Sequence, residues 1–436
     1  MPEALGYRSD GVEAETDNRP WYAGVTRYQW LVLIIASAGW VFDAFEGQVF
    51  NITRDDMLRQ LLGPGHGPEQ KFWGDVFLAI FLLGGTVGGI GFGNLADKVG
   101  RKPIMAVTIL FYSVFSGLTY FATSLWHVAI LRFLVALGVG GEWAVAASLV
   151  AEVFPARARA RAGGIFHGTS VMGTWLAALA GLAVGTHWRY AYLMSIVPAL
   201  LLVWVRASIQ EPERWKNAGA EKGRLGSFRD LFFDARWGPR ALLGLFLAAV
   251  GLGTFWGVVV AGQDLTKELL LRLGWPAPDA IAQSKIAFGF VQATGMGVGF
   301  VCMGPLAEWV GRRGAFFVMH LGAVIIVPAT CYLPHAYWQM LVILPVYGFF
   351  TGGMHAGYAI YFPELFPDRL RATGAGVCFN GGRLVAAPML YISALIKSRP
   401  GIDLRTAVVF MSGFYVLGLV LLRFLPETKG RPLPQD

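Results

Sequence analysis

The segment GNLADKVGRK at 93–102 recurs as GPLAEWVGRR at 304–313, and this repeat decides the fold. A second pair, AEVFPARARARAGG at 151–164 and PELFPDRLRATGAG at 363–376, recurs at the same offset of about 210 residues. The copies share acidic residues, glycines and arginines, a combination too particular to arise from composition alone. Two independent motifs repeated at one offset indicate that the chain is a duplication of two related halves.

Composition places both halves in a lipid bilayer. Of the 436 residues, 55% are hydrophobic and 15% are charged, and the mean hydropathy is +0.52, whereas about a quarter of the residues in soluble domains are charged. The charges cluster in short segments between apolar runs long enough to cross a hydrocarbon core about 30 Å thick. The net charge of +8 comes without a separate long basic segment, which argues against a nucleic-acid partner.

Twelve apolar stretches each have about the length of a membrane-spanning helix. An even number puts both termini on one side, and the loops of that side hold most of the arginines and lysines, as cytoplasmic loops do. We therefore predict an all-α protein of the plasma (inner) membrane, with twelve transmembrane helices in two pseudo-symmetric six-helix bundles and cytoplasmic termini. The stretches lie near 30–50, 72–95, 104–123, 125–150, 162–185, 188–209, 240–263, 283–306, 315–333, 338–361, 372–396 and 403–425.

The longest interior polar stretch divides these spans six and six. It lies at 210–239 and reads as a cytoplasmic linker between a first bundle at 30–209 and a second at 240–425. The tails at 1–29 and 426–436 are polar, and the first lacks the basic region and cleavage pattern of a signal peptide. Halves related by an axis along the membrane normal would form a substrate site between them, near the midplane.

The repeated segment resembles the signature of the major facilitator superfamily, which joins the second and third helices. Further similarity lies in LRFLVALGVGGEW at 131–143, QEPER at 210–214 and LPETKGR at 425–431. The resemblance covers nearly the whole chain and implies a twelve-helix transporter that works by alternating access.

Shorter motifs resemble the metabolite:proton symporters of that superfamily, nearest to the sialate and monocarboxylate branch. They are GWVFDAF at 39–45, GGEW at 140–143 and FNGGRLVAA at 379–387. That branch carries Asn, Ser and His before a Gln-Asp pair in its seventh helix, whereas 256–264 reads WGVVVAGQD. The missing residues put the branch's known substrates in doubt and leave the fold unaffected.

Two acids on the first helix are candidates for proton coupling. Asp43 and Glu46 are three residues apart and therefore share a face. Counted from Trp30, Asp43 lies about 20 Å into the membrane, where an ionised carboxylate is costly unless it lines a cavity or pairs with a cation. A buried carboxyl group binds a proton more readily than an exposed one. The alternative is a structural pair with Arg132 of the fourth helix, an arginine whose family counterpart is implicated in proton handling.

Arg383 is the corresponding cation of the second half. It lies about 17 Å into the eleventh predicted helix, with no acid near it in the sequence, so a carboxylate substrate could supply the missing partner. The alternative is an ion pair with Asp43 or Glu46 that closes a gate. Asn380 shares the helix face of Arg383, and Gln292 and His167 are further candidates for substrate binding.

The repeated motifs predict a cytoplasmic gate. An acid at the end of one half can be held by the positive N-terminus of a helix from the other half, here the eleventh. The alternative is that these basic loops only set the topology. The predicted gate residues are Asp97, Arg101, Glu152, Glu308, Arg312, Glu364 and Arg371.

These residues favour a secondary transporter, a proton-coupled symporter of a small organic anion. The alternatives are a proton-coupled sugar or polyol importer, a drug:proton antiporter and a transport-like sensor. The sequence contains no phosphate-binding loop, catalytic triad or metal-ligand cluster, and its three cysteines match no zinc or disulfide spacing. We therefore expect a monomer whose partners are a small substrate, protons and the bilayer, with no enzymatic activity, cofactor or metal.

Overall fold

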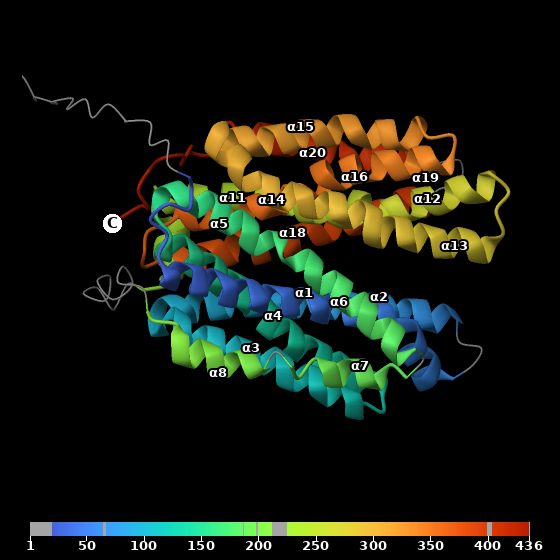
Figure 1. Ribbon diagram of the computed structural model, residues 1–436, viewed down its shortest axis with the longest axis horizontal. Helices are drawn as coiled ribbons and strands as arrows, with labels where there is room; N and C mark the ends of the chain where they lie inside the picture. Colours follow the sequence, from blue (N-terminus) through green and yellow to red (C-terminus); the bar gives the residue numbers. More distant parts are fainter. Residues whose placement is uncertain are drawn as a thin grey trace, which may run out of the picture.

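A computed structural model describes residues 20–63, 67–185, 187–197, 199–211, 225–398 and 403–435. Figure 1 shows long helices lying side by side, with most of the first half below, most of the second half above, and α5 (Ala156–Gly168) of the first half lying against α14 (Ala293–Trp309) of the second. The first half contains α1 (Arg27–Leu62), α2 (Gly67–Val99), α3 (Arg101–Leu118), α4 (Leu125–Val153), α5 (Ala156–Gly168), α6 (Ser170–Val184), α7 (Arg189–Met194) and α8 (Ala199–Ser208).

The second half follows the short helix α10 (Phe228–Phe233). Its elements are α11 (Trp237–Thr254), η3 (Phe255–Val259), α12 (Ala261–Arg272), α13 (Ala277–Ile286), η4 (Ala287–Gln292), α14 (Ala293–Trp309), α15 (Gly311–Tyr332), α16 (Tyr337–Gly353), α17 (His355–Tyr361), η5 (Phe362–Leu365), α18 (Arg371–Ser398), α19 (Leu404–Ser412) and α20 (Phe414–Leu421).

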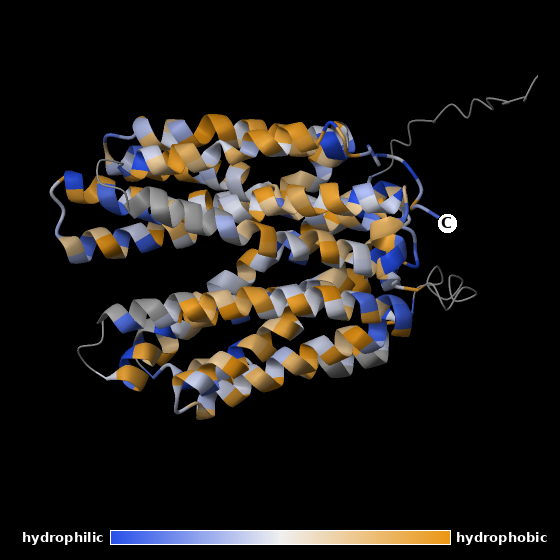
Figure 2. Ribbon diagram, turned by 180° about the vertical axis from the view of Figure 1, so that it is seen from behind, coloured by the Kyte–Doolittle hydropathy of each residue, from blue (hydrophilic) through white to orange (hydrophobic). Residues whose placement is uncertain are grey.

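Each of the twelve predicted spans falls on helical segments. Several of these are longer than the predicted span or are made of consecutive pieces, as where α5 and α6 meet at Gly168 and Ser170. Nine helices of the described ranges are long and apolar enough to cross a membrane, and Figure 2 shows apolar residues along their middle parts. The all-helical membrane fold is therefore confirmed, while twelve crossings and the proposed domain boundaries stay predictions, and 1–19 and 212–224 lie outside the described residues.

Glycines allow the two halves to approach closely, and they do so at equivalent places. A Cβ atom added at Gly93 of α2 would lie 2.7 Å from the Ala372 carbonyl oxygen of α18. At Gly304 of α14 it would lie 2.7 Å from the Ala160 carbonyl oxygen of α5. Gly93 and Gly304 hold the same position in the repeated motif, so the duplicated sequence builds both contacts between the halves.

The last glycine of each motif ends a helix by a backbone conformation that other residues rarely adopt. Gly100 has φ of 120° and Gly311 has φ of 85°, and each leads directly into the next helix. Glu211 caps that next helix in the first half, accepting 2.9 Å hydrogen bonds from the backbone N–H groups of Arg101 and Lys102. In the second half Glu427 accepts from Arg312 at 2.9 Å in the same way. The segments that follow each bundle therefore close onto the repeated motifs.

Candidate functional site: a gated cavity between the halves

Asp97 joins the end of α2 to the start of α18. Its carboxylate accepts hydrogen bonds from the backbone N–H groups of Ala372 (3.2 Å) and Thr373 (2.8 Å), and from the Thr373 hydroxyl (2.6 Å). Asp97 and Thr373 are both fully buried. A carboxylate at a helix N-terminus is stabilised by the helix dipole and by N–H groups that have no partner inside the helix. The structure thus places Asp97 where the sequence analysis expected an acid of one half to meet a helix of the other.

An ion-pair cluster surrounds this contact. Arg101 binds Glu152 through two nitrogens, at 3.2 Å and 2.7 Å, and also pairs with Asp97 at 2.9 Å. From the other half, Arg371 reaches Glu152 at 3.0 Å. Paired charges with several hydrogen bonds tolerate burial, whereas removing one partner leaves a buried charge uncompensated. The cluster therefore ties α2, α4 and α18 together.

The repeat builds a second cluster from the equivalent residues. Arg312 binds Glu364 through two nitrogens at 2.9 Å and 2.8 Å, and Arg159 of the first half approaches Glu364 at 3.7 Å. Glu308, the counterpart of Asp97, accepts a 2.6 Å hydrogen bond from Arg161 of α5. All seven residues predicted for the gate therefore lie in two related clusters that join the halves.

Both clusters lie at the end of the bundle where α1 starts and α8 ends, which we call the terminal end. Closer to the middle, the rings of Trp143 on α4 and Phe379 on α18 stack with centroids 3.9 Å apart. Asn380 bridges the halves beside them, because its backbone carbonyl accepts from the Thr86 hydroxyl at 3.2 Å and its side-chain amide donates to the Gly140 carbonyl at 3.4 Å. The halves are in close contact from the terminal end to the middle of the bundle.

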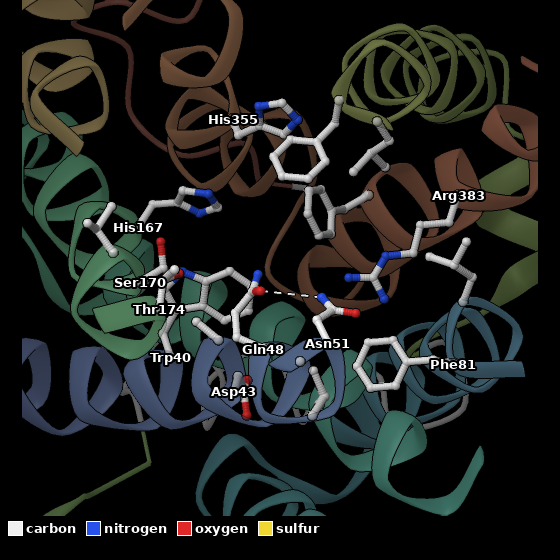
Figure 3. Close-up of a pocket in the computed structure, with 18 of the residues that line it drawn as sticks. Trp40, Asp43, Gln48, Asn51, Phe81, His167, Ser170, Thr174, His355 and Arg383 are labelled. Carbon is white, nitrogen blue, oxygen red and sulfur yellow. Dashed lines mark hydrogen bonds between the residues drawn. The ribbon is translucent and has the colours of Figure 1, made fainter. Parts of the chain in front are cut away.

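A cavity of about 250 Å³ lies beyond these contacts and is lined by both halves (Figure 3). Most of the lining is apolar or aromatic, including Phe81, Phe255, Phe300 and Phe379. The polar and charged side chains of the lining are Trp40, Asp43, Gln48, Asn51, Arg132, His167, Ser170, Thr174, His355 and Arg383.

Arg383 enters the cavity from α18 (Figure 3). Its guanidinium carbon lies 5.3 Å from the centre of the Phe379 ring, and its Nη1 atom is buried without a hydrogen-bond partner among the described residues. Gly85 of α2 makes room for this nitrogen, since a Cβ there would collide with it. Because a buried polar group without a partner is costly, the guanidinium has unused capacity to bind an anion.

Asp43 lies on the opposite side of the cavity, on α1. It is 2% exposed, and neither carboxylate oxygen has a hydrogen-bond partner in the described part of the chain. Its electrostatic neighbours are Glu142, Glu46 and, with opposite charge, Arg383. Burying an acid in this environment costs the fold free energy, so Asp43 is a candidate for a functional role.

Glu142 of α4 is an electrostatic neighbour of Asp43. It is fully buried, accepts a 2.6 Å hydrogen bond from the Thr108 hydroxyl and has one oxygen without a partner in the described residues. A Cβ at Gly39, one turn before Asp43, would lie 2.7 Å from that free oxygen. Residues of α3 and α1 therefore cover this carboxylate, which no count along α4 reveals.

Glu46 and Arg132 turn away from Asp43. Glu46 is fully buried inside the first half and accepts a 2.5 Å bond from Ser116. Arg132 lies over the rings of Phe50 and Phe81, with its guanidinium carbon 4.2 Å and 3.9 Å from their centres, and it donates to the Glu46 backbone oxygen at 3.4 Å. The expected direct pairing of Arg132 with Asp43 is not present in the structure.

Of the other predicted binding residues, only His167 lines the cavity. Asn380 sits at the interface described above, and Gln292 lies inside the second half, where its amide donates to the Val259 carbonyl at 2.7 Å. That carbonyl belongs to η3, a π-helical turn whose loosened ladder leaves carbonyls that need other partners. The position of Gln292 is thus explained by the backbone irregularity, which the sequence did not predict.

Several cavity residues were missed by sequence analysis. Gln48 and Asn51 follow Asp43 along α1, and Ser170 and Thr174 follow His167 along α5 and α6. Helical spacing from His167 could have found Ser170 and Thr174, since positions three to four apart share a face. Gln48 lies five residues after Asp43 and does not follow from this rule. The aromatic lining could not be found in this way, because aromatic residues occur on every face of these helices.

A helical membrane protein whose two related halves enclose a cavity near the middle of the bundle, sealed at one end by exchanged ion pairs, has the architecture of a transporter. The profile of the Major Facilitator Superfamily matches residues 73–388. The chain belongs to this superfamily and is a membrane transporter rather than an enzyme.

Similar proteins are known by sequence and by structure. The chain is 28% identical to the sialic acid transporter NanX of Escherichia coli (92% of each chain) and 27% identical to a probable 4-methylmuconolactone transporter of Cupriavidus pinatubonensis (94% of this chain, 93% of the relative). The proton:xylose symporter XylE superimposes with a TM-score of 0.74 at 18% identity, covering 93% of this chain and 98% of its own. At that identity, the structural likeness shows the fold alone.

Proposed function

We propose that this transporter is a proton-coupled symporter of a small organic anion, working by alternating access in the plasma membrane. The observation that carries the proposal is Arg383, a half-buried residue that lines an apolar cavity and whose Nη1 atom is buried without a hydrogen-bond partner in the described residues. A carboxylate is the group whose charge and planar geometry fit it best. Relatives that carry sialic acid or 4-methylmuconolactone support this substrate class.

Competition for Arg383 provides a physical route to coupling. The guanidinium attracts Asp43 across the cavity, so a substrate carboxylate that binds Arg383 takes over part of this attraction. Asp43 then gains free energy by binding a proton, since it is buried beside the like-charged Glu142. Proton and anion therefore bind together more favourably than either does alone, which is the thermodynamic condition for symport.

The lining favours an anion over the sugar alternative. A sugar needs many hydrogen-bonding side chains around its ring, whereas this cavity is lined mainly by aromatic and aliphatic groups. Gln48 and Asn51 are the main amide groups available, and they already share a 3.3 Å hydrogen bond. An apolar planar acid would match the lining without leaving hydroxyl groups unpaired.

The charge distribution supports an orientation in which the terminal end faces the cytoplasm. The predicted basic loops gather there, as the positive-inside rule expects. In this orientation the contacts at the terminal end close the cavity towards the cytoplasm, and substrate would enter from the other side. We further propose that the monomer is the transporting unit, because both gate clusters and the cavity are built within one chain.

The test is uptake by proteoliposomes under an imposed pH gradient, using labelled benzoate, sialic acid and xylose. We expect gradient-driven uptake of an acid. Asp43→Asn should abolish this uptake, whereas the control Asp279→Asn, at an exposed acid in the first turn of α13, should preserve it. Undiminished accumulation by Asp43→Asn would rule out its role in coupling. Uptake of xylose in preference to every acid would favour the sugar alternative.

The role of Arg383 is tested separately by substrate binding at equilibrium. Arg383→Gln should weaken carboxylate binding by about 30-fold or more, since a charged hydrogen bond contributes about 2 kcal/mol or more. Arg423→Gln changes an exposed arginine at the end of the second half and serves as the control. Equal affinity for acids in Arg383→Gln and the unaltered protein would contradict the proposed anion site.

A further inference from the structure

A polar stripe crosses the cavity wall opposite Arg383. His167 at the end of α5 and Ser170 and Thr174 on α6 all line the cavity, and Figure 3 shows them on the side of the first half while Arg383 enters from the other. The three residues follow at helical spacing, so their side chains share a face. A small molecule bound to Arg383 by one end would present its other end to this stripe.

The imidazole of His167 is held in one orientation. Its centre lies 5.3 Å from the Trp40 ring and 5.0 Å from the Phe300 ring, and the side chain is 4% exposed. The indole Nε1 of Trp143 donates to its Nδ1 at 3.4 Å. A group held in place before the ligand arrives loses little conformational entropy on binding.

The hydrogen bond from Trp143 also fixes the chemistry of the ring. An indole N–H only donates, so Nδ1 of His167 must be the acceptor and the neutral imidazole carries its proton on Nε2. In a doubly protonated ring, the N–H group at Nδ1 would face the indole N–H group of Trp143, and two donors cannot form a hydrogen bond. His167 is therefore a neutral donor, beside two hydroxyl groups that can also donate.

The stripe contains no fixed positive charge. Arg132, the other cation of the lining, is turned onto the rings of Phe50 and Phe81, and Asp43 adds negative charge on the same side of the cavity. A second carboxylate at this end of a ligand would find no cation to balance its charge. A neutral acceptor, such as a ring nitrogen or a carbonyl oxygen, fits better.

We propose that His167, with Ser170 and Thr174, forms a second binding point that selects planar monocarboxylates carrying a neutral hydrogen-bond acceptor at the end away from the carboxylate. This inference rests on the proposed anion site at Arg383 and narrows its substrate class to one-ring or conjugated acids with such an acceptor. The apolar lining holds the ring, Arg383 holds the carboxylate, and the stripe distinguishes acids of the same size.

Nicotinate and benzoate are a matched pair for the test, because they differ by a ring nitrogen in place of a C–H group. We expect purified protein to bind nicotinate roughly tenfold more tightly than benzoate, as a hydrogen bond to a buried donor allows. His167→Phe should remove the difference by weakening nicotinate alone, and His167→Gln, which keeps a donor, should restore part of it. His127→Phe, at an exposed histidine of α4, is the control.

Three results would overturn the inference while leaving the anion site intact. These are equal affinities for nicotinate and benzoate in the unaltered protein, an equal loss for both acids in His167→Phe, and tighter binding of the dicarboxylate muconate than of nicotinate. If neither acid binds, the inference fails, while uptake of sialic acid still tests the proposed function. If both acids bind independently of Arg383, the proposed function itself fails and the inference fails with it.

Discussion

Replacing Asp97 with asparagine removes the negative charge that the N-terminus of α18 holds. The side-chain amide of Asn has one oxygen acceptor and no charge. It can accept from the N–H group of Ala372 or from that of Thr373, and neither hydrogen bond is then charge-assisted. The lost charge-assisted hydrogen bond is worth about 1.5–3 kcal/mol, and the lost attraction to the helix terminus adds about 0.3–2 kcal/mol. These contacts join the halves only while the terminal end is closed, whereas the pair of Asp97 with Arg101 lies within one half.

The variant should therefore destabilise the closed terminal end by about 3 kcal/mol relative to the open one, a shift of about 150-fold in their ratio. Electron-resonance distance measurements between spin labels at Lys98 and Trp309 would report it. Both positions are exposed, and they lie at the terminal ends of α2 and α14, on opposite halves.

We expect a population with longer distances to appear in Asp97→Asn and to be absent in the control Asp279→Asn, at an exposed acid of α13. An unchanged distance distribution, in a variant that folds and inserts normally, would refute the assignment of Asp97 to the gate. It would then be a structural residue whose contacts persist in both states.

Three further predictions concern the glycines and a cap. Gly100→Ala should lower the unfolding temperature by several degrees, because φ of 120° costs a residue with a Cβ about 1–3 kcal/mol, whereas Gly91→Ala, where a Cβ meets nothing within 4 Å, should be neutral or stabilising. Gly89→Ala should place a methyl group against Asn380 and so favour the open terminal end in the same spin-label assay, and an unchanged distribution would contradict the close packing of α2 on α18. Burial alone would raise the pKa of Glu427, but hydrogen bonds from the backbone N–H groups of Arg312, Lys429, Arg313 and Thr428 hold that pKa below its usual value. Its stabilising contribution is therefore present above the unfolded pKa of about 4.3 and is lost as pH falls through the lower folded pKa. The difference in unfolding temperature between the unaltered protein and Glu427→Gln should then shrink on acidification. A constant difference would argue against the cap.

The two ion-pair clusters were within reach of sequence analysis because their information is local and duplicated. Asp97 and Arg101 sit four residues apart, and Glu308 and Arg312 repeat this spacing in the second half. A chain that repeats such a pattern at the end of a membrane span brings each copy to an equivalent place between the halves. The contacts across the halves, such as Arg371 with Glu152, then follow from placing one copy against the other.

The cavity was accessible only in part. Arg383 and Asp43 are charges inside apolar helices, and the cost of burying them singled them out without any structure. The surroundings of Glu142 and Gln292 could not be predicted, because the identity of their partners depends on neighbouring helices. Glu142 is covered by α1 and α3, and Gln292 donates a hydrogen bond to a carbonyl that a π-helical turn leaves without its usual partner.

The sequence alone determined that this protein is a duplicated bundle of membrane helices, because hydrophobic length, charge position and repeated motifs are properties of the chain itself. Only the tertiary structure decided which polar groups face one cavity and which are bonded to other groups inside the protein. The hydrogen bond from Trp143 that fixes the proton of His167 joins two different helices. The space at Gly85 that admits Arg383 also depends on two helices. Such contacts depend on how helices rotate and approach one another, and that rotation is set by packing across the whole bundle rather than by any single segment.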